Sequence, residues 1–247
     1  MNAAEKSLPQ NAVTTPIVPT KLAHYVIRAK HFSEMLAWYR QVFHLRTSFE
    51  APVIAFLTYD EEHHRIAFLN TAHLPAPEQL QTGIDHVAFT YAGLPDLLLT
   101  YERLKKVGIT PFWCINHGPT TSMYFKDPDA NEIELQVDNY PTLAEAVGYF
   151  TSPAFAANPI GVDYDPDLLL QKFQAGVPIS ELLKQGAAPV APGKLADILL
   201  TPLHFIGEKI FHLAFGRRPA ERAKLFVARA WLIRRRSGRH CRRSHAR

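Results

Sequence analysis

Cysteine is scarce in this chain of 247 residues. Its two cysteines, Cys114 and Cys241, lie far apart, and Cys241 is within a run of arginines. Such a pair cannot build a disulfide framework or a cysteine-rich zinc site. A chain of this length can bury a sizeable core without cross-links. We therefore expect a globular protein from a reducing compartment, with Cys114 as a small buried side chain.

The sequence also lacks long apolar runs. It contains no stretch of about 18 uncharged apolar residues, the length that spans a bilayer. Residues 1–20 do not show the basic and then apolar order of a secretory signal. These absences predict a cytoplasmic protein that does not span a membrane.

Acidic residues are almost missing from the C-terminal end. Residues 217–247 contain twelve Lys or Arg and one acid, Glu221, so this tail carries +11 and residues 1–216 carry −7, which gives the total of +4. The tail shows no zinc-finger or helix-turn-helix pattern and no interleaved aromatic residues, so we expect no nucleic-acid binding. We interpret it as a solvated or partner-facing helix end. Adsorption of residues 195–236 to an anionic membrane surface is the less favoured alternative.

The first half of the folded region reads as a strand, a helix and further strands. Residues 21–28 are rich in β-forming side chains, and apolar residues recur at helical spacing over 33–43, where Ser33 is the expected N-cap. Two short β-rich runs follow within residues 53–69, with room for one more strand near Thr47. This half predicts a βαβββ module.

The same order recurs in the second half. A β-rich run over residues 83–91 precedes a helical run over 94–107, which Gly108 ends. Two further strands then lie on either side of the turn Asp127–Asn131. The recurrence predicts an internal duplication of roughly 55 to 60 residues.

One histidine near the start of each half fixes the alignment of the repeat. Superposing His24 on His86 brings the two predicted helices together and places Ala67 opposite Glu134. Both histidines are predicted to lie in the first strand of their module. Equivalent positions in a duplicated sheet can converge on one site, so these residues are candidates for shared chemistry.

Two such modules, a histidine early in each and the segment Asp127-Pro-Asp-Ala-Asn-Glu-Ile-Glu134 resemble the vicinal oxygen chelate superfamily over about residues 21–140. Within it, the sequence is most similar to the type I extradiol catechol dioxygenases. The resemblance implies an α+β fold in which paired βαβββ modules form a cupped open barrel around a metal. Ala130 departs from the family pattern, which usually has Gly at that point of the turn.

The organisation that follows has four segments. We predict a flexible arm over 1–19, a vicinal-oxygen-chelate domain over 20–145 with modules of about 20–78 and 82–145, an extension of turns and short helices over 146–190, and amphipathic helices with a basic tail over 191–247. Residues 158–184 of the extension are expected to pack against the edge of the barrel or against a second subunit.

Two histidines and one carboxylate form the candidate metal site. His24, His86 and Glu134 could converge on one face and leave open coordination positions, an arrangement that suits non-haem Fe(II) oxygenases. Ala67 lies where glyoxalase I members supply a fourth ligand, and alanine cannot ligate. We therefore predict these three residues as ligands of Fe(II), with Mn(II) as the alternative. Glu132 lies on the same strand face as Glu134, and the family spacing after the Asp turn selects Glu134.

Three further residues suggest the reaction. His63-His64-Arg-Ile-Ala-Phe resembles the extradiol segment whose second histidine acts as acid and base, which assigns that role to His64; His73, in a proline-containing loop, is the competitor. Tyr124, ten residues before the carboxylate ligand, matches the family tyrosine that hydrogen-bonds a catechol oxygen. His117 resembles the family histidine that adjusts this hydrogen bonding, at a spacing about two residues shorter than usual.

The resemblance implies an Fe(II)-dependent extradiol dioxygenase that cleaves a catechol-type aromatic diol with O2. Two alternatives remain open from the sequence. One is a metal-dependent member of the superfamily that catalyses conjugation or epimerisation without O2, and the other is a metal-free small-molecule binding protein of the bleomycin-resistance kind. We also expect a homo-oligomer, because cups of this superfamily often pair by their edges.

Overall fold

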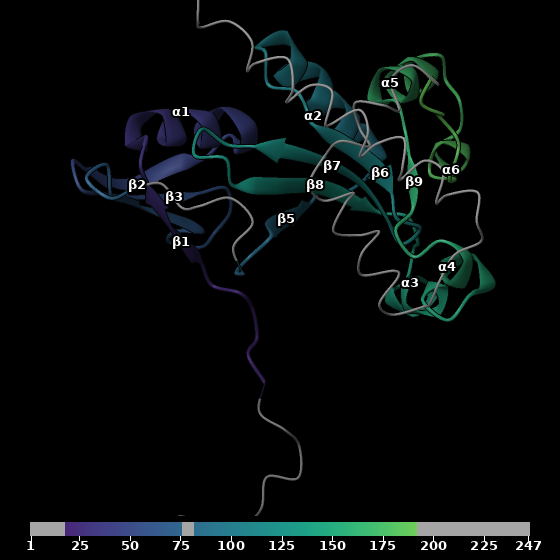
Figure 1. The fold of residues 1–247 in the computed structure, drawn as a ribbon, viewed down its shortest axis with the longest axis horizontal. Coiled ribbons are helices and arrows are strands. Elements are labelled where there is room, and N and C mark those ends of the chain that lie inside the picture. The colour runs from purple at the N-terminus through teal and green to yellow at the C-terminus, as the bar shows by residue number, and fades with distance from the viewer. Residues whose placement is uncertain (1–17, 76–81, 192–247) are drawn as a thin grey trace, which may run out of the picture. The chain divides into compact units, whose positions relative to one another are not determined.

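A computed structural model describes residues 18–75 and 82–191 (Figure 1), which fall into two compact units. Unit 1 comprises the described residues up to Gly83 together with Asp127–Asn131, and unit 2 comprises Ile84–Lys126 and the described residues from Glu132 onward. Almost all of the predicted N-terminal arm, the predicted amphipathic helices after residue 191 and the basic tail lie outside the described residues.

Unit 1 contains one sheet of four strands and one helix. The strand order is β1-β4-β3-β2, with β1 parallel to β4 and the other neighbours antiparallel. The elements are β1 (Tyr25–Ala29), α1 (Phe32–Phe43), β2 (Arg46–Ala51), β3 (Ile54–Thr58) and β4 (Ile66–Asn70). Helix α1 packs on β4 through side chains at helical spacing, namely Met35, Leu36, Tyr39 and Val42. The strand predicted near Thr47 is present as β2.

Helix α1 begins two residues earlier than an N-cap at Ser33 predicts. Its N-cap is His31, whose side chain makes no capping hydrogen bond, so the expectation that Ser33 is the cap is wrong. The carboxylate of Asp129 instead accepts hydrogen bonds from the backbone N–H groups of Lys30 (2.7 Å) and His31 (3.2 Å). A carboxylate distant in sequence thus satisfies donors at this end of the helix.

Unit 2 contains a sheet of five strands in the order β5-β8-β7-β6-β9. The module elements are β5 (His86–Thr90), α2 (Leu94–Lys106), β6 (Trp113–Asn116), β7 (Thr120–Lys126) and β8 (Glu132–Asp138). The extension contributes α3 (Leu143–Tyr149), α4 (Pro153–Ala157), β9 (Val162–Asp163), α5 (Pro166–Gln174) and α6 (Ile179–Leu182). The sequence did not predict β6, β9, α3 or α4. Cys114, in β6, is a buried free thiol, as expected.

The two sheets have the same internal order and register. β1 is parallel to β4 in unit 1, as β5 is to β8 in unit 2, and the remaining module strands are antiparallel in both. Val26 lies opposite Ala67, and Ala88 lies opposite Glu134. Val26 and Ala88 each follow their module's early histidine by two residues, so the registers reproduce the predicted correspondence of Ala67 with Glu134. The α+β class and the βαβββ modules are confirmed, and neither sheet closes into a barrel within the described residues.

The extension joins the second sheet instead of forming a separate layer. Strand β9 pairs antiparallel with β6, with Ile115 opposite Asp163 and Asn116 opposite Val162. The hydroxyl of Tyr164 donates to the carbonyl of Ser122 at 3.2 Å. The extension therefore covers a sheet edge, one of the two positions expected for it. None of the helices in the described part of the chain has the length and apolarity needed to span a bilayer.

Candidate functional site

The histidines of unit 1 gather beside the start of β1. His24 directly precedes β1, one residue outside the strand in which it was predicted, and His63 and His64 lie in the turn between β3 and β4. The ring centroids of His24 and His64 are 4.2 Å apart, and the Nδ1 atoms of His63 and His64 are 2.5 Å apart. His64 also stacks on Phe56 at 4.7 Å. The predicted ligand His24 and the predicted acid–base residue His64 are therefore neighbours.

The environment of His64 favours its neutral form. Burial lowers the pKa of His64, and the neighbouring His24 and His63 lower it further, against a smaller opposing effect of Glu62. A histidine with a pKa below its ordinary value is unprotonated at neutral pH and has a ring nitrogen that can accept a proton. This is the protonation state that a general base needs.

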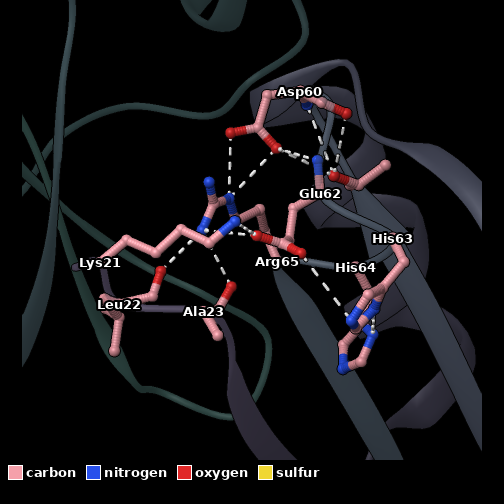
Figure 2. A network of polar contacts seen from close by, with 9 residues as sticks. Lys21, Leu22, Ala23, Asp60, Glu62, His63, His64 and Arg65 are labelled. Atoms are coloured by element: carbon pink, nitrogen blue, oxygen red, sulfur yellow. Dashed lines mark hydrogen bonds and ion pairs between the residues drawn. The ribbon is translucent and has the colours of Figure 1, made fainter. Parts of the chain in front are cut away.

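Arg65 links the two backbone segments that carry these histidines (Figure 2). Its guanidinium donates to the carbonyls of Leu22 (2.6 Å) and Ala23 (2.9 Å), just before His24, and to both carboxylate oxygens of Asp60 (3.1 and 3.0 Å). The Arg65 side chain is 20% exposed, so these charge-assisted hydrogen bonds are partly shielded from water. One side chain therefore fixes the approach to β1 against the turn between β3 and β4.

Glu62 lies at the edge of the same network. Its carboxylate pairs with the ammonium of Lys21 and lies 3.8 Å from the Arg65 guanidinium. The Lys21 hydrogen bond is the main reason why the pKa of Glu62 lies below its ordinary value. The carboxylate is also 3.8 Å from Nε2 of His63, so it provides negative charge beside the histidine turn.

In unit 2, His86 and Glu134 form an ion pair across β5 and β8. His86 Nε2 lies 3.0 Å from Glu134 Oε2, and His86 Nδ1 lies 2.8 Å from Asp85 Oδ2. The hydrogen bond with Glu134 raises the pKa of His86 to about 9, although burial opposes this. Burial raises the pKa of Glu134, but hydrogen bonds with His86 and Ser122 outweigh it and bring the pKa below its ordinary value. The pair is therefore charged at neutral pH.

Tyr124 and His117 adjoin this ion pair. Tyr124 lies opposite Glu134 in the β7–β8 register and contacts the His86 ring edge-on, with centroids 5.2 Å apart. The Tyr124 hydroxyl lies 3.1 Å from His117 Nε2, and His117 Nδ1 lies 2.5 Å from the carbonyl oxygen of Ile160. Burial, and then the charge of Glu134, raise the pKa of Tyr124, so its hydroxyl stays protonated as a donor. Unit 2 thus brings together all four site residues predicted in it.

Trp113 and Asp163 complete this group; the sequence offered Trp113 as a residue that lines the substrate mouth, but it did not identify Asp163 as functional. The Trp113 ring stacks on Tyr124 with centroids 4.8 Å apart and an angle of 27° between the planes. The Trp113 indole N–H donates to Asp163 Oδ1 at 2.9 Å. The two residues are 50 positions apart, and only the pairing of β6 with β9 brings them together, so no local pattern could have revealed the contact.

The competing candidates have other environments. Glu132 lies 3.6 Å from Lys126, and its Oε2 atom has no hydrogen-bond partner, whereas Glu134 pairs with His86. His73 is exposed in the loop after β4. Within residues 18–75 and 82–191, no group of three or more His, Cys, Asp or Glu side chains is arranged to hold a metal ion. The triad remains a prediction, because its members belong to both units.

Comparisons with known proteins agree with the predicted resemblance. The family model described as Glyoxalase/Bleomycin resistance protein/Dioxygenase superfamily matches residues 21–135. The chain is 42% identical to biphenyl-2,3-diol 1,2-dioxygenase 2 of Rhodococcus globerulus over 163 residues, which are 66% of this chain and 86% of the relative. It is 39% identical to biphenyl-2,3-diol 1,2-dioxygenase 3 of the same organism over 188 residues, which are 75% of this chain and 99% of the relative.

Solved structures align with about half of the chain. The lactoylglutathione lyase from Agrobacterium tumefaciens aligns with 48% of this chain and 94% of its own, at 17% identity and a TM-score of 0.41. The assignment therefore rests on the two sequence relatives, of which this chain covers most or nearly all, and on the family model. This chain belongs to the glyoxalase/bleomycin resistance protein/dioxygenase superfamily.

Proposed function

We propose that this chain is an Fe(II)-dependent extradiol dioxygenase that uses O2 to cleave the ring of a catechol-type aromatic diol beside its hydroxyl groups. The observation that carries the proposal is the similarity to two biphenyl-2,3-diol 1,2-dioxygenases at 42% and 39% identity. A fold hosts many activities, so the proposal also requires side chains that suit this chemistry.

The proposed metal ligands are His24, His86 and Glu134. Two imidazoles and one carboxylate are the donor set of non-haem Fe(II) oxygenases. The surroundings of His86 fit this role, because its Nδ1 faces the Asp85 carboxylate at 2.8 Å while its Nε2 faces Glu134. Metal-ligating histidines commonly donate their second ring N–H to a carboxylate in this way. Bound Fe(II) would supply coordination positions for the diol oxygens and for O2, and Mn(II) is the alternative metal.

His64 is the proposed general base and acid. It is held in its neutral form by burial and by the neighbouring His24 and His63. It would accept a proton from a diol hydroxyl as the substrate binds, and it would return a proton as the ring opens. Both oxygen atoms of O2 enter the product and one ring carbon–carbon bond breaks, so the reaction needs no external reductant.

Tyr124 is the proposed hydrogen-bonding partner of a substrate oxygen. Its hydroxyl stays protonated next to Glu134, and it lies 3.1 Å from His117 Nε2. A hydrogen-bonding group that is fixed before the substrate arrives costs little reorganisation during the reaction.

Homo-oligomer formation through sheet edges remains a further prediction, for which sedimentation equilibrium is the test.

Oxygen consumption tests the proposed function directly. The full chain is loaded anaerobically with Fe(II), mixed with biphenyl-2,3-diol or catechol, and followed with an oxygen electrode and by absorbance in the near-visible range. We expect equimolar loss of O2 and diol with a yellow ring-opened product. Samples loaded with Mn(II) identify the metal, and a chelator-treated sample is the control.

Two other results would contradict the proposal in distinct ways. An iron-loaded chain that binds the diol without consuming O2 would indicate a non-oxidative member of the superfamily. A chain that binds the diol equally well after chelation, again without O2 uptake, would indicate a metal-free binding protein.

A further inference from the structure

We propose that the segment Asn158–Asp163 of the extension is a positioning element for the catalytic group of unit 2. It fixes the tautomer of His117 and the place of the Trp113 ring, and through both it holds the Tyr124 hydroxyl. The importance of this hydroxyl for turnover rests on the proposed function. The contacts themselves lie within unit 2 and can be tested without activity.

The carbonyl of Ile160 determines which nitrogen of His117 carries the proton. A carbonyl oxygen can only accept, so the short contact of 2.5 Å requires a proton on His117 Nδ1. Burial lowers the pKa of His117, so the ring is neutral and its Nε2 carries no proton. In its 3.1 Å contact with Nε2 the Tyr124 hydroxyl can then act only as the donor, and it shares that proton with the Glu134 carboxylate. A backbone carbonyl of the extension therefore sets the direction of this hydrogen bond.

Asn158 shapes the loop that presents this carbonyl. Its side-chain amide donates to the carbonyl of Gly161, and its Oδ1 accepts from the Gly161 N–H at 3.3 Å. Gly161 has a φ of +118°, and a Cβ placed there would lie 2.4 Å from the backbone oxygen of Asn116. The loop thus lies directly against the backbone that leads to His117, and only glycine fits this close approach.

Asp163 positions the other neighbour of Tyr124. Its carboxylate accepts the indole N–H of Trp113 at 2.9 Å, and the Trp113 ring stacks on Tyr124. Trp113 and Tyr124 are 4% and 3% exposed, and Ile160 packs against the same cluster. The β6–β9 pairing fixes Asp163 opposite Ile115. The Tyr124 ring is therefore held by stacking while its hydroxyl is held by His117, which preorganises the position of the hydroxyl oxygen.

The tautomer of His117 is the first test. Long-range ¹H–¹⁵N correlation spectra of the metal-free chain distinguish protonation at Nδ1 from protonation at Nε2. We expect a single Nδ1-protonated form in the wild type and a mixture of tautomers in Asn158→Ala. Tyr101→Phe is the matched control, because it removes another tie of the extension, the 2.7 Å bond from Tyr101 to Asp167, without touching this loop. An Nε2-protonated wild type, or an Asn158→Ala chain with an unchanged His117 spectrum, would overturn the inference.

Turnover of the iron-loaded chain is the second test. Asp163→Leu is expected to lower kcat about tenfold with unchanged iron content, and Asp163→Asn, which keeps an acceptor oxygen, to restore most of it. In a Tyr124→Phe background the Asp163→Leu effect should largely vanish, because no hydroxyl remains to be positioned. An equal loss in both backgrounds would show a merely structural role and overturn the inference. If the wild type consumes no O2, the proposed function fails, and the tautomer spectra still decide the positioning role.

Discussion

The two units share one strand order, but their surroundings shift the pKa of a histidine in opposite directions. In unit 1, His64 stacks on Phe56, contacts the His24 ring at a tilt and has a lowered pKa. In unit 2, His86 pairs with a buried carboxylate and its pKa is raised to about 9. In the metal-free chain the duplication has thus produced one half with a neutral proton acceptor and another with a charged pair, which must release the His86 proton when a metal binds.

One register position distinguishes the surroundings of the early histidine in each unit. Ala67 in β4 and Glu134 in β8 lie opposite equivalent residues of the first strands. A carboxylate at the second position fixes His86, whereas the methyl group at the first leaves His24 to contact another ring instead. The early histidines of the two units therefore differ in their neighbours, and a single side chain at one register position distinguishes them.

Removing the Glu134 carboxylate should have the largest effect, on both iron content and O2 uptake. Glu134→Ala is expected to lose iron and to show no detectable O2 uptake, because it removes one of three proposed ligands; His24→Ala and His86→Ala should do the same. Metal analysis after gel filtration, together with the oxygen electrode, measures both quantities. Glu132→Gln, on the same strand face, is the matched control and should keep its iron. Full activity in any of the three ligand variants would contradict the ligand assignment.

Removing the Arg65 hydrogen bonds of unit 1 should have an intermediate effect, on the free energy of unfolding. Arg65→Leu removes four hydrogen bonds that tie residues 22 and 23 to Asp60, and should lower the free energy of unfolding by about 1.5–3 kcal/mol. Arg40→Leu removes a more exposed ion pair with Glu50 in the same unit and should cost less than about 1 kcal/mol. Urea denaturation of the metal-free chain compares the two. Equal losses would show that Arg65 is not a special support of the histidine turn.

The ion pair of His86 with Glu134 should have a smaller, pH-dependent effect on the free energy of unfolding. The pKa of His86 is raised from 6.5 to about 9, so its contribution to stability is complete below pH 6.5 and is lost as the pH rises through about 9. The lowered pKa of Glu134 contributes stability that is lost as the pH falls toward the acid range. Denaturation of the metal-free chain at several pH values should show wild-type stability falling between pH 6.5 and 9, with a flatter profile in Glu134→Gln. An identical slope in both chains would remove this pair as the cause.

The sequence was sufficient for the parts of the fold that repeat. Aligning His24 with His86 predicted the relation between Ala67 and Glu134, because strand order and spacing are conserved within the chain and each sheet keeps its register. The predicted neighbours Tyr124 and His117 also lie together in unit 2. The internal duplication therefore predicts the register relation, and the family resemblance predicts Tyr124 and His117.

The remaining features depend on contacts that are distant in sequence. All four residues of β6 are buried, so the strand shows none of the alternation that reveals a half-exposed strand. Strand β9 has only two residues and exists through its pairing with β6. The contact of His117 with Ile160 spans 43 positions. No local pattern encodes such pairings, so the role of the extension emerges only from the folded chain.

The proposed role of His64 as the proton acceptor is tested most directly by His64→Phe. The variant keeps an aromatic ring that can stack on Phe56 but has no proton-accepting nitrogen. Iron content, diol binding and O2 uptake are measured on the same anaerobically loaded sample. We expect unchanged iron, retained diol binding and turnover reduced by about 10²–10⁴-fold. Turnover close to that of the wild type would show that His64 is not the proton acceptor.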